Sequence, residues 1–128
     1  GGIHAYYLAM QSILNPGDQF LGVALLAKSF YLYQVATSSE SRIRLYSTSM
    51  AQVLDQSRSL TTAPGLGTQQ GLIFDVQLDT APEIWLCENV SGSNGDTPQS
   101  TTTYITVDNL GAISEAISVS IIFVPTQS

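Results

Sequence analysis

The chain has 128 residues and a mass of 13.7 kDa, which is the size of one domain. Its formal net charge is −6 and only four residues are basic, which argues against a surface that follows nucleic-acid phosphates. One cysteine and one histidine exclude an internal disulfide framework and a zinc finger. The longest apolar run, 20–27, is too short to span a membrane, and residues 1–4 lack the basic region of a signal peptide. We therefore expect a soluble domain.

The N-terminal segment allows two interpretations. Apolar residues recur in it at the spacing of one helical face: Ile3, Tyr7, Met10 and Leu14. This spacing predicts a helix of about three turns, but an extended arm is an equal alternative. The sequence Asn-Pro-Gly-Asp at 15–18 then marks a turn. We expect residues 1–18 to form an arm or a short helix, and residues 19–128 to form the main domain.

From residue 20 onward the sequence has the character of β-strands. The segments are rich in aromatic and β-branched residues or alternate between apolar and polar positions. In the last of them, Ile117, Val119, Ile121 and Phe123 make one inward row. The seven predicted strands are 20–27, 29–37, 42–46, 71–79, 83–88, 102–109 and 115–124.

Seven short strands with turn-rich joints are typical of an all-β fold, and we predict a single antiparallel β-sandwich of jelly-roll type. Two long connections interrupt the strands. The first, 47–70, contains one or two helical turns near residues 50–54, and the second, 90–101, is rich in Gly, Ser, Asn and Asp. Loops this long in a small domain are usually functional or disordered, so both are candidates for contact with a partner.

The sequence offers little for catalysis. His4, the one histidine, lies near the chain end, and Cys87 stands in a predicted strand as a buried, inert thiol. The strand carboxylates, such as Asp75 and Asp79, are best explained as solvated side chains. The 93–97 loop lacks the spacing of an EF-hand, and no cofactor motif is present. We therefore expect no catalytic residue, metal or cofactor, and a hydrolase with cross-strand carboxylates is the weakest alternative.

The aromatic residues allow a carbohydrate-binding interpretation. Trp85 and six tyrosines provide rings that stack on sugars as on other apolar faces. A tryptophan in a central strand, however, is more often part of the core. For this reason we keep the sugar-binding platform only as an alternative interpretation.

Three of the four basic residues fall within one short window: Arg42, Arg44 and Arg58. Strand alternation places Arg42 and Arg44 on the face opposite Ile43 and Leu45. If Asp55 folds back, a fork between arginine and carboxylate would pin the 47–70 connection to the sheet. A solvated arginine pair and a site for an anionic ligand are the two other interpretations.

Motifs in the same region form an ordered pattern. An R-x-R-L-Y-S strand (42–47) leads into a loop with a D-x-x-R element, Asp55 to Arg58. A Gly-hydrophobic-Asp strand follows at 71–75, and a V-x-N-L hairpin occupies 107–110. In this order the motifs, over roughly residues 42–124, resemble those of small β-sandwich structural proteins of tailed bacteriophages. The first 41 residues carry no matching motif.

The resemblance implies a non-enzymatic virion protein, above all a capsid decoration (cement) protein that binds the assembled shell as an oligomer, with a trimer favoured. The implied partners are the major capsid protein, or another virion protein, and sister copies. Few surface charges favour association on independent grounds. A tail or baseplate component and a carbohydrate-binding module are the alternatives. The residues expected in contacts are Tyr6, Tyr7, Met10, Arg42, Arg44, Asp55, Arg58 and Trp85.

Overall fold

A computed structural model describes residues 5–65, 70–79 and 83–127, with the side chains in these ranges except those of 5–12, 83 and 89. These residues form strands and one short helix. The elements are β1 (Ala5–Leu14), β2 (Gln19–Leu25), β3 (Ser29–Thr37), β4 (Ser41–Tyr46), α1 (Ser49–Asp55), β5 (Leu72–Leu78), β6 (Glu83–Ser93), β7 (Thr102–Asn109) and β8 (Glu115–Gln127). No helical segment in the described ranges combines the length and the hydropathy that a membrane crossing requires.

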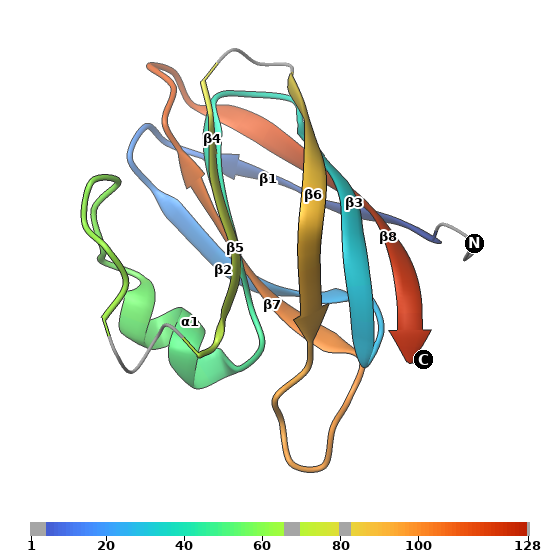
Figure 1. Cartoon of the computed structure of the whole chain (residues 1–128). Helices are drawn as coiled ribbons and strands as arrows, with labels where there is room; N and C mark the ends of the chain where they lie inside the picture. Colours follow the sequence, from blue (N-terminus) through green and yellow to red (C-terminus); the bar gives the residue numbers. More distant parts are fainter. Residues whose placement is uncertain (1–4, 66–69, 80–82, 128) are drawn as a thin grey trace.

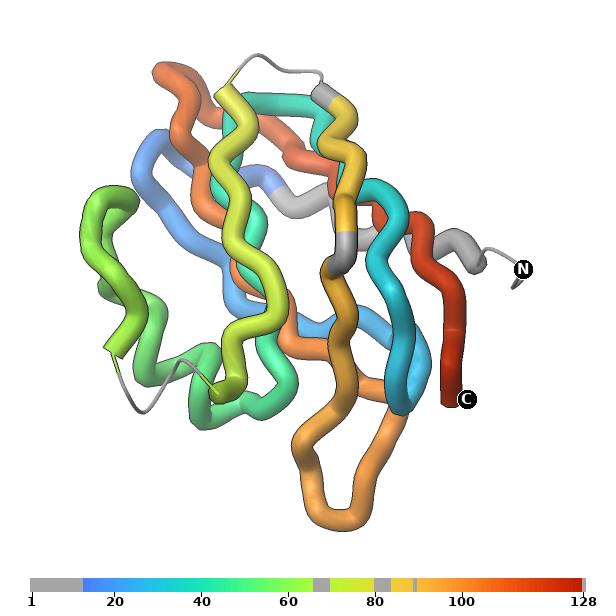
Figure 2. Tube along the Cα trace, in the orientation of Figure 1, coloured from blue at the N-terminus to red at the C-terminus, as the bar shows by residue number. Residues whose placement is uncertain are grey.

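The strands form two four-stranded antiparallel sheets that enclose one core (Figures 1 and 2). One sheet has the order β1-β8-β3-β6 and the other has the order β2-β7-β4-β5. We call them the β8 sheet and the β7 sheet. Helix α1 lies on the side of the β7 sheet in Figure 1. The predicted all-β antiparallel fold is therefore confirmed at this level.

The core is built from the inward side chains of both sheets. The row Ile117, Val119, Ile121 and Phe123 is buried, as the alternation in β8 predicts. The ring of Phe123 meets that of Phe30 on β3 edge to face, with 6.0 Å between centroids. From the β7 sheet, residues such as Ile43 and Val107 close the other side of the same core.

The N-terminal segment is a strand, so the helix alternative is wrong. β1 pairs with β8 over nearly its whole length, from Ala5 opposite Phe123 to Leu14 opposite Glu115. At its described end the side chains alternate, because Leu14 is 8% exposed and Ile13 is 74% exposed. Local spacing could not reveal this result, since the strand is stabilised by a partner about a hundred residues away. It raises the number of strands in the described residues to eight.

The connections are tighter than the sequence predicts. Gly17 takes a positive φ of 82° in the turn between β1 and β2, a conformation that suits glycine. β6 continues to Ser93, so the second long connection shortens to 94–101. The Asn94 side chain orders that loop by accepting hydrogen bonds from the backbone N–H groups of Asp96 and Ser100. The predicted loop over 90–101 is therefore wrong in its first four residues.

The neighbouring residues Ile13 and Leu14 provide a test of β1 as part of the core. Leu14→Ala should lower the free energy of unfolding by about 2–5 kcal/mol, because it leaves a cavity beside the core. Ile13→Ala is the matched control and should change it by less than about 0.5 kcal/mol. Urea unfolding followed by circular dichroism measures both values. Equal, small effects would contradict the placement of β1.

Candidate functional site

Strand β4, which carries the predicted contact residues Arg42 and Arg44, is buried on both faces. Ile43 and Leu45 face the core, and Arg42 and Arg44 face the opposite side of the sheet, as predicted. The side chains of Arg42 and Arg44 are 3% and 0% exposed. They are covered by α1 and the chain that follows it. The interpretation as a solvated arginine pair is therefore wrong.

Arg42 is held by a bidentate contact with Asp75 on the neighbouring strand β5. Its Nε donates to Asp75 Oδ1 at 3.0 Å and its Nη2 donates to Oδ2 at 2.8 Å. Its Nη1 donates to the carbonyl oxygen of Arg58 at 2.8 Å, which ties the connection to the sheet. Asp75 is therefore a paired carboxylate that also keeps contact with solvent, because its side chain is 23% exposed. Bidentate pairs of this kind combine strength with directional specificity.

Arg44 joins the end of α1 to strand β7. Its Nη1 donates to the carbonyl oxygen of Asp55 at 2.7 Å, and its Nη2 donates to Asp108 Oδ2 at 3.0 Å. The carboxylate of Asp55 also lies 3.6 Å from Nη1. Asp108 accepts a further hydrogen bond from Gln19 Nε2 on β2, at 3.0 Å. The contact therefore links three strands and the helix.

Asp55 is the centre of the cluster. Arg58 grips it with two hydrogen bonds, Nε to Oδ1 at 2.6 Å and Nη2 to Oδ2 at 3.0 Å. The hydroxyl of Tyr46 donates to the same carboxylate. Arg58 Nη2 also reaches Asp75 Oδ2 at 2.6 Å. The fork on Asp55 comes from Arg58, within the same connection, whereas the sheet arginines reach the connection through its carbonyl oxygens. We name the cluster Arg42, Arg44, Tyr46, Asp55, Arg58, Asp75 and Asp108 the clasp.

The clasp lowers the pKa of two of its carboxylates, those of Asp55 and Asp75. Burial by itself would raise the pKa of Asp55, but the hydrogen bonds from Arg58 and Tyr46 and the nearby positive charges outweigh it and lower the pKa. The pKa of Asp75 is lowered in the same way, by Arg42 and Arg58 against burial. Burial and the bond to Asp55 raise the pKa of Tyr46. Both aspartates are thus ionised and Tyr46 is neutral at neutral pH.

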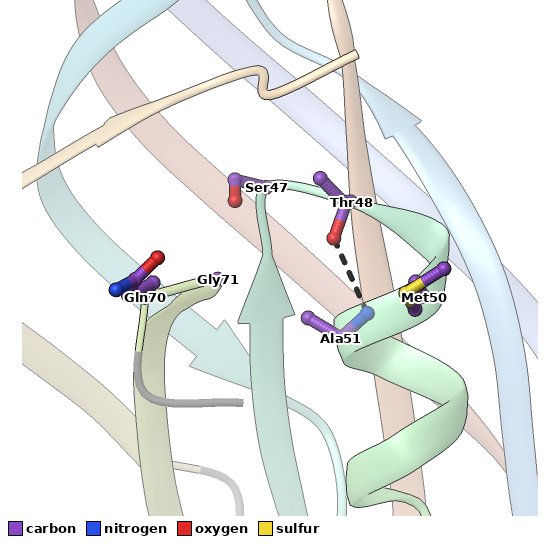
Figure 3. Close-up of a pocket in the computed structure, with 6 residues that line it drawn as sticks. All are labelled: Ser47, Thr48, Met50, Ala51, Gln70 and Gly71. Carbon is purple, nitrogen blue, oxygen red and sulfur yellow. Dashed lines mark hydrogen bonds between the residues drawn. The ribbon is translucent and has the colours of Figure 1, made fainter. Parts of the chain in front are cut away.

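Helix α1 is fixed to the sheet by polar contacts as well. Thr48 caps it, with Oγ1 accepting from the N–H of Ala51 at 3.2 Å (Figure 3). Gln52 Nε2 donates to the carbonyl oxygens of Gly22 and Ile105, at 3.1 and 2.8 Å. These bonds hold the helix against the paired strands β2 and β7.

A small pocket lies where α1 begins. It has a volume of about 250 Å³ and is lined by Ser47, Thr48, Met50, Ala51, Gln70 and Gly71 (Figure 3). A Cβ added to Gly71 would lie 2.5 Å from the Cβ of Ala51, so glycine permits the close approach of helix and strand. Small-molecule sites usually measure about 300–1,000 Å³. We therefore assign this pocket to packing.

The clasp is electrically neutral, which decides the charge of the remaining surface. It pairs three of the four basic residues with three of the ten acids. Lys28 and seven acids remain outside it. The arginine side chains of the clasp are at most 9% exposed, so they offer no surface for an anionic ligand. The net charge of −6 therefore belongs to the residues outside the clasp.

Trp85 is exposed to solvent, although its place in a predicted strand favoured a position in the core. β6 lies at the edge of the β8 sheet, and Trp85 is 42% exposed there, flanked by the exposed side chains of Ile84 and Leu86. The prediction that this tryptophan belongs to the core is wrong, because the sequence could not show that β6 is an edge strand. Cys87 in the same strand packs on the core, and burial raises its pKa to about 11. This thiol is therefore protonated at neutral pH.

Several predicted contact residues lie beyond what the structure describes. The backbones of Tyr6, Tyr7 and Met10 belong to β1, but their side chains are outside the described set. His4 also lies outside the described residues. Within the described ranges, no group of three or more His, Cys, Asp or Glu residues is arranged to hold a metal ion.

The sequence interpretation missed Asp75 and Asp108 as clasp members. Strand alternation gave a usable signal, because it places Asp75 opposite the core face of its strand. What was lacking is the register of the strands. The backbone of Arg44 lies opposite Asp75 and that of Arg42 lies opposite Asp108. Each arginine side chain therefore reaches the carboxylate on the diagonal, Arg42 that of Asp75 and Arg44 that of Asp108. The exposed apolar side chains of α1, Met50, Val53 and Leu54, were also missed. Their exposure depends on which helix face the clasp turns to the sheet.

Removal of Arg58 tests the clasp. Arg58→Ala leaves the buried carboxylate of Asp55 with fewer partners and should cost about 3–5 kcal/mol of unfolding free energy. Cleavage by chymotrypsin should appear first in the 47–70 connection, because Arg58 holds it to the sheet. Arg58→Lys, which keeps the charge but loses the fork, should have an intermediate effect. An unchanged cleavage pattern in Arg58→Ala would refute the clasp.

Acid should release the clasp. Asp55 and Asp75 have pKa values below the ordinary 3.8, so the unfolded chain binds protons at a higher pH than the folded chain. The stabilisation is complete above pH 3.8 and is lost as the pH falls below it. Unfolding free energies measured from about pH 6 to about pH 2 should show this decline, and Asp55→Asn should flatten it. A wild-type stability that stays constant down to about pH 2 would contradict this assignment.

Comparison with known protein families and with curated proteins finds no match to this chain. The comparisons therefore assign neither a family nor an activity. The functional argument rests on the clasp, the fold and the exposed surfaces described above.

Proposed function

We propose that this chain is a non-enzymatic structural protein of a virion, and that it acts as a capsid decoration protein of the tailed-phage type. In this role it would bind the assembled shell as a homo-oligomer, with a trimer as the favoured form, and contact the major capsid protein. A tail or baseplate position is the alternative within the same class. Four observations support the proposal.

The first observation is the strand order, from which we infer a jelly roll. The hydrogen-bonded pairs include β1 with β8, β2 with β7, β3 with β6 and β4 with β5. This is the pairing obtained when one long antiparallel hairpin is rolled into two sheets. Double-sheet jelly rolls of eight strands are used by viral capsid proteins and by lectins. The strand order thus favours a capsid-associated or sugar-binding role.

The second observation carries the proposal: the motifs that resemble phage structural proteins meet in one place. Arg42, Arg44, Asp55, Arg58 and Asp75 bind one another in the clasp. These residues come from the R-x-R, D-x-x-R and Gly-hydrophobic-Asp elements. Separate weak motifs that interlock in space form one structural signature. Because the motifs that resemble phage structural proteins also bind one another here, the clasp supports a structural role of that kind.

The remaining motif residues have structural roles too. Gly71 accepts a hydrogen bond from the N–H of Ser47 at 2.8 Å, so the ends of the first long connection meet. Asn109, from the V-x-N-L element, donates to the carbonyl oxygens of Leu14 and Ile113, at 2.9 and 3.0 Å. It also accepts from the N–H of Gly111. This residue joins the β7–β8 hairpin to the end of β1.

The third observation is how the charged residues are used. Asp55 and Asp75 each accept a hydrogen bond from Arg58. Asp55 also accepts one from Tyr46, and Asp75 also accepts one from Arg42. A carboxylate saturated by arginines has a low pKa and is a poor proton donor or acceptor at neutral pH. The strongest electrostatic cluster of the described residues thus serves the fold. This supports a role without catalysis.

The fourth observation is the apolar character of the surface. Large apolar side chains on α1, β2, β3 and β6 are exposed, and charged residues make up 11% of the chain. Aromatic enrichment and depletion of charge characterise interface cores. A protein that binds an assembled shell but not its separate subunits stabilises the shell by mass action. The surface suits this role.

Sedimentation with capsid shells tests the proposal. The purified chain should sediment with assembled shells of the tailed-phage major capsid protein from its own source, and should raise their melting temperature. It should not bind the unassembled capsid subunits. Sedimentation with tails in place of shells would move the protein to the tail alternative. Binding to neither particle would refute the virion role.

A second function, carbohydrate binding, is favoured by one observation. Trp85 is 42% exposed at the edge of the β8 sheet. Aromatic side chains at a surface can stack on sugar rings. The decoration role predicts that polysaccharides leave the fluorescence of Trp85 unchanged. Saturable quenching by a polysaccharide, lost in Trp85→Ala, would favour the sugar-binding function instead.

A further inference from the structure

Three buried side-chain atoms have no hydrogen-bond partner among the described residues: Arg44 Nε, Thr103 Oγ1 and Thr106 Oγ1. All three side chains are 0% exposed. A buried polar group without a partner is costly, and a charged group costs more than a neutral one. Two of the three atoms, those of Arg44 and Thr106, belong to neighbouring strands of the β7 sheet.

The register places these two side chains next to each other. Arg44 on β4 lies directly opposite Thr106 on β7. In β7, Ile105 and Val107 face the core, so Thr106 between them faces the clasp, as Arg44 does. Side chains directly opposite each other in antiparallel strands have Cβ atoms about 4.5–5.5 Å apart. One small molecule can therefore contact both side chains.

The two arginines of β4 use their guanidinium groups differently, which explains why Arg44 Nε lacks a partner. Nε–H and one Nη2–H point in the same direction, and Arg42 donates both to the carboxylate of Asp75. Arg44 binds Asp108 through Nη2 alone. The other oxygen of Asp108, Oδ1, accepts a hydrogen bond from Gln19 Nε2. Because Arg44 Nη2–H points to a residue of β7, its Nε–H points toward the same strand.

Helix α1 covers this part of the β7 sheet. Gln52 Nε2 donates to the carbonyl oxygen of Ile105 at 2.8 Å, and Ile105 precedes Thr106 in β7. Arg44 Nη1 donates to the carbonyl oxygen of Asp55, the last residue of α1, at 2.7 Å. The two unpartnered atoms therefore lie between the helix and the sheet, and a ligand that binds them has to be small.

We propose that Arg44 Nε and Thr106 Oγ1 together bind one buried water molecule. The water accepts a hydrogen bond from Nε–H and makes a second one with the Thr106 hydroxyl, which can donate or accept. Buried waters typically bind to buried polar groups that lack a protein partner. The water joins β4 to β7 beneath α1 and completes the contacts of the Arg44 guanidinium. This site is independent of the virion role.

The charge of the clasp favours water over a small anion. An anion would also accept a hydrogen bond from Arg44 Nε–H. It would, however, place a further negative charge beside the carboxylates of Asp55 and Asp108, which already bind the same guanidinium. The clasp pairs three arginines with three aspartates, so this charge would be buried without a counter-charge. Water provides the acceptor and adds no charge.

A high-resolution crystal structure of the wild-type chain tests the site directly, together with a second crystal soaked in bromide. We expect a density peak about 2.7–3.2 Å from both Arg44 Nε and Thr106 Oγ1, with no anomalous signal from bromide at that position. An anomalous peak there would replace the water by an anion. Absence of the density peak, or a protein acceptor bonded to Arg44 Nε, would overturn the proposal.

A pair of matched variants tests the contribution of the water to stability. Thr106→Val keeps the shape of the side chain but removes the hydroxyl. It should raise the equilibrium constant of unfolding about fivefold, because the water and Arg44 Nε–H lose a shared partner. Thr103→Val is the control, since Thr103 lies in the same strand with an equally buried hydroxyl but faces the core, as Ile105 does. It should leave this constant unchanged or lower it.

Urea unfolding followed by circular dichroism measures both constants. A Thr106→Val variant that is as stable as Thr103→Val would contradict the water bridge, because a hydroxyl without a partner is no loss. If Thr106→Val does not fold, the crystal structure still decides the question, since it uses the wild-type chain.

Discussion

The ion pair between Arg58 and Asp55, together with the bonds that both residues make to β4 and β5, fixes the outer layer of this molecule to the sheet. Asp55 ends α1, and its carboxylate is shared by Arg58 and Tyr46 and lies beside Arg44. Through these partners the helix and the following turn are fixed to β4, the strand buried on both faces. A buried carboxylate needs such a set of donors, because its desolvation is costly without them. The position of α1, and of the apolar side chains on its outer surface, follows from this contact.

The same contact explains the unusual distribution of charge. Three arginines and three aspartates neutralise one another inside the clasp, so the rest of the chain has a single lysine and seven acids. The assembly role that we propose draws on this surface, which has few charges and exposed apolar side chains. A buried ion-pair network adds less to stability than an apolar core of equal volume, but it defines one geometry. This geometry fixes the orientation of the exposed apolar side chains of α1.

Strand alternation and turn residues were sufficient to predict the seven strands from 20 onward and the antiparallel class. They also predicted the partnership of Asp55 with an arginine. Three features escaped because they depend on distant parts of the chain. β1 is a strand because β8 offers it a partner, whereas its local spacing also fits a helix. Asp75 joins the clasp through the register of β4 and β5, and Trp85 is exposed because β6 is an edge strand.

Hydrogen–deuterium exchange of the wild-type chain tests most directly whether the clasp fixes the connection to the sheet. The backbone N–H groups of Gln52 and Arg58 donate to the carbonyl oxygens of Thr48 and Asp55, inside the clasped segment. Our account predicts that their exchange is slow and approaches that of the amides in β4, because opening them requires breaking the buried ion pairs. Exchange of this segment at the rate of an unprotected loop, with β4 still protected, would contradict the account.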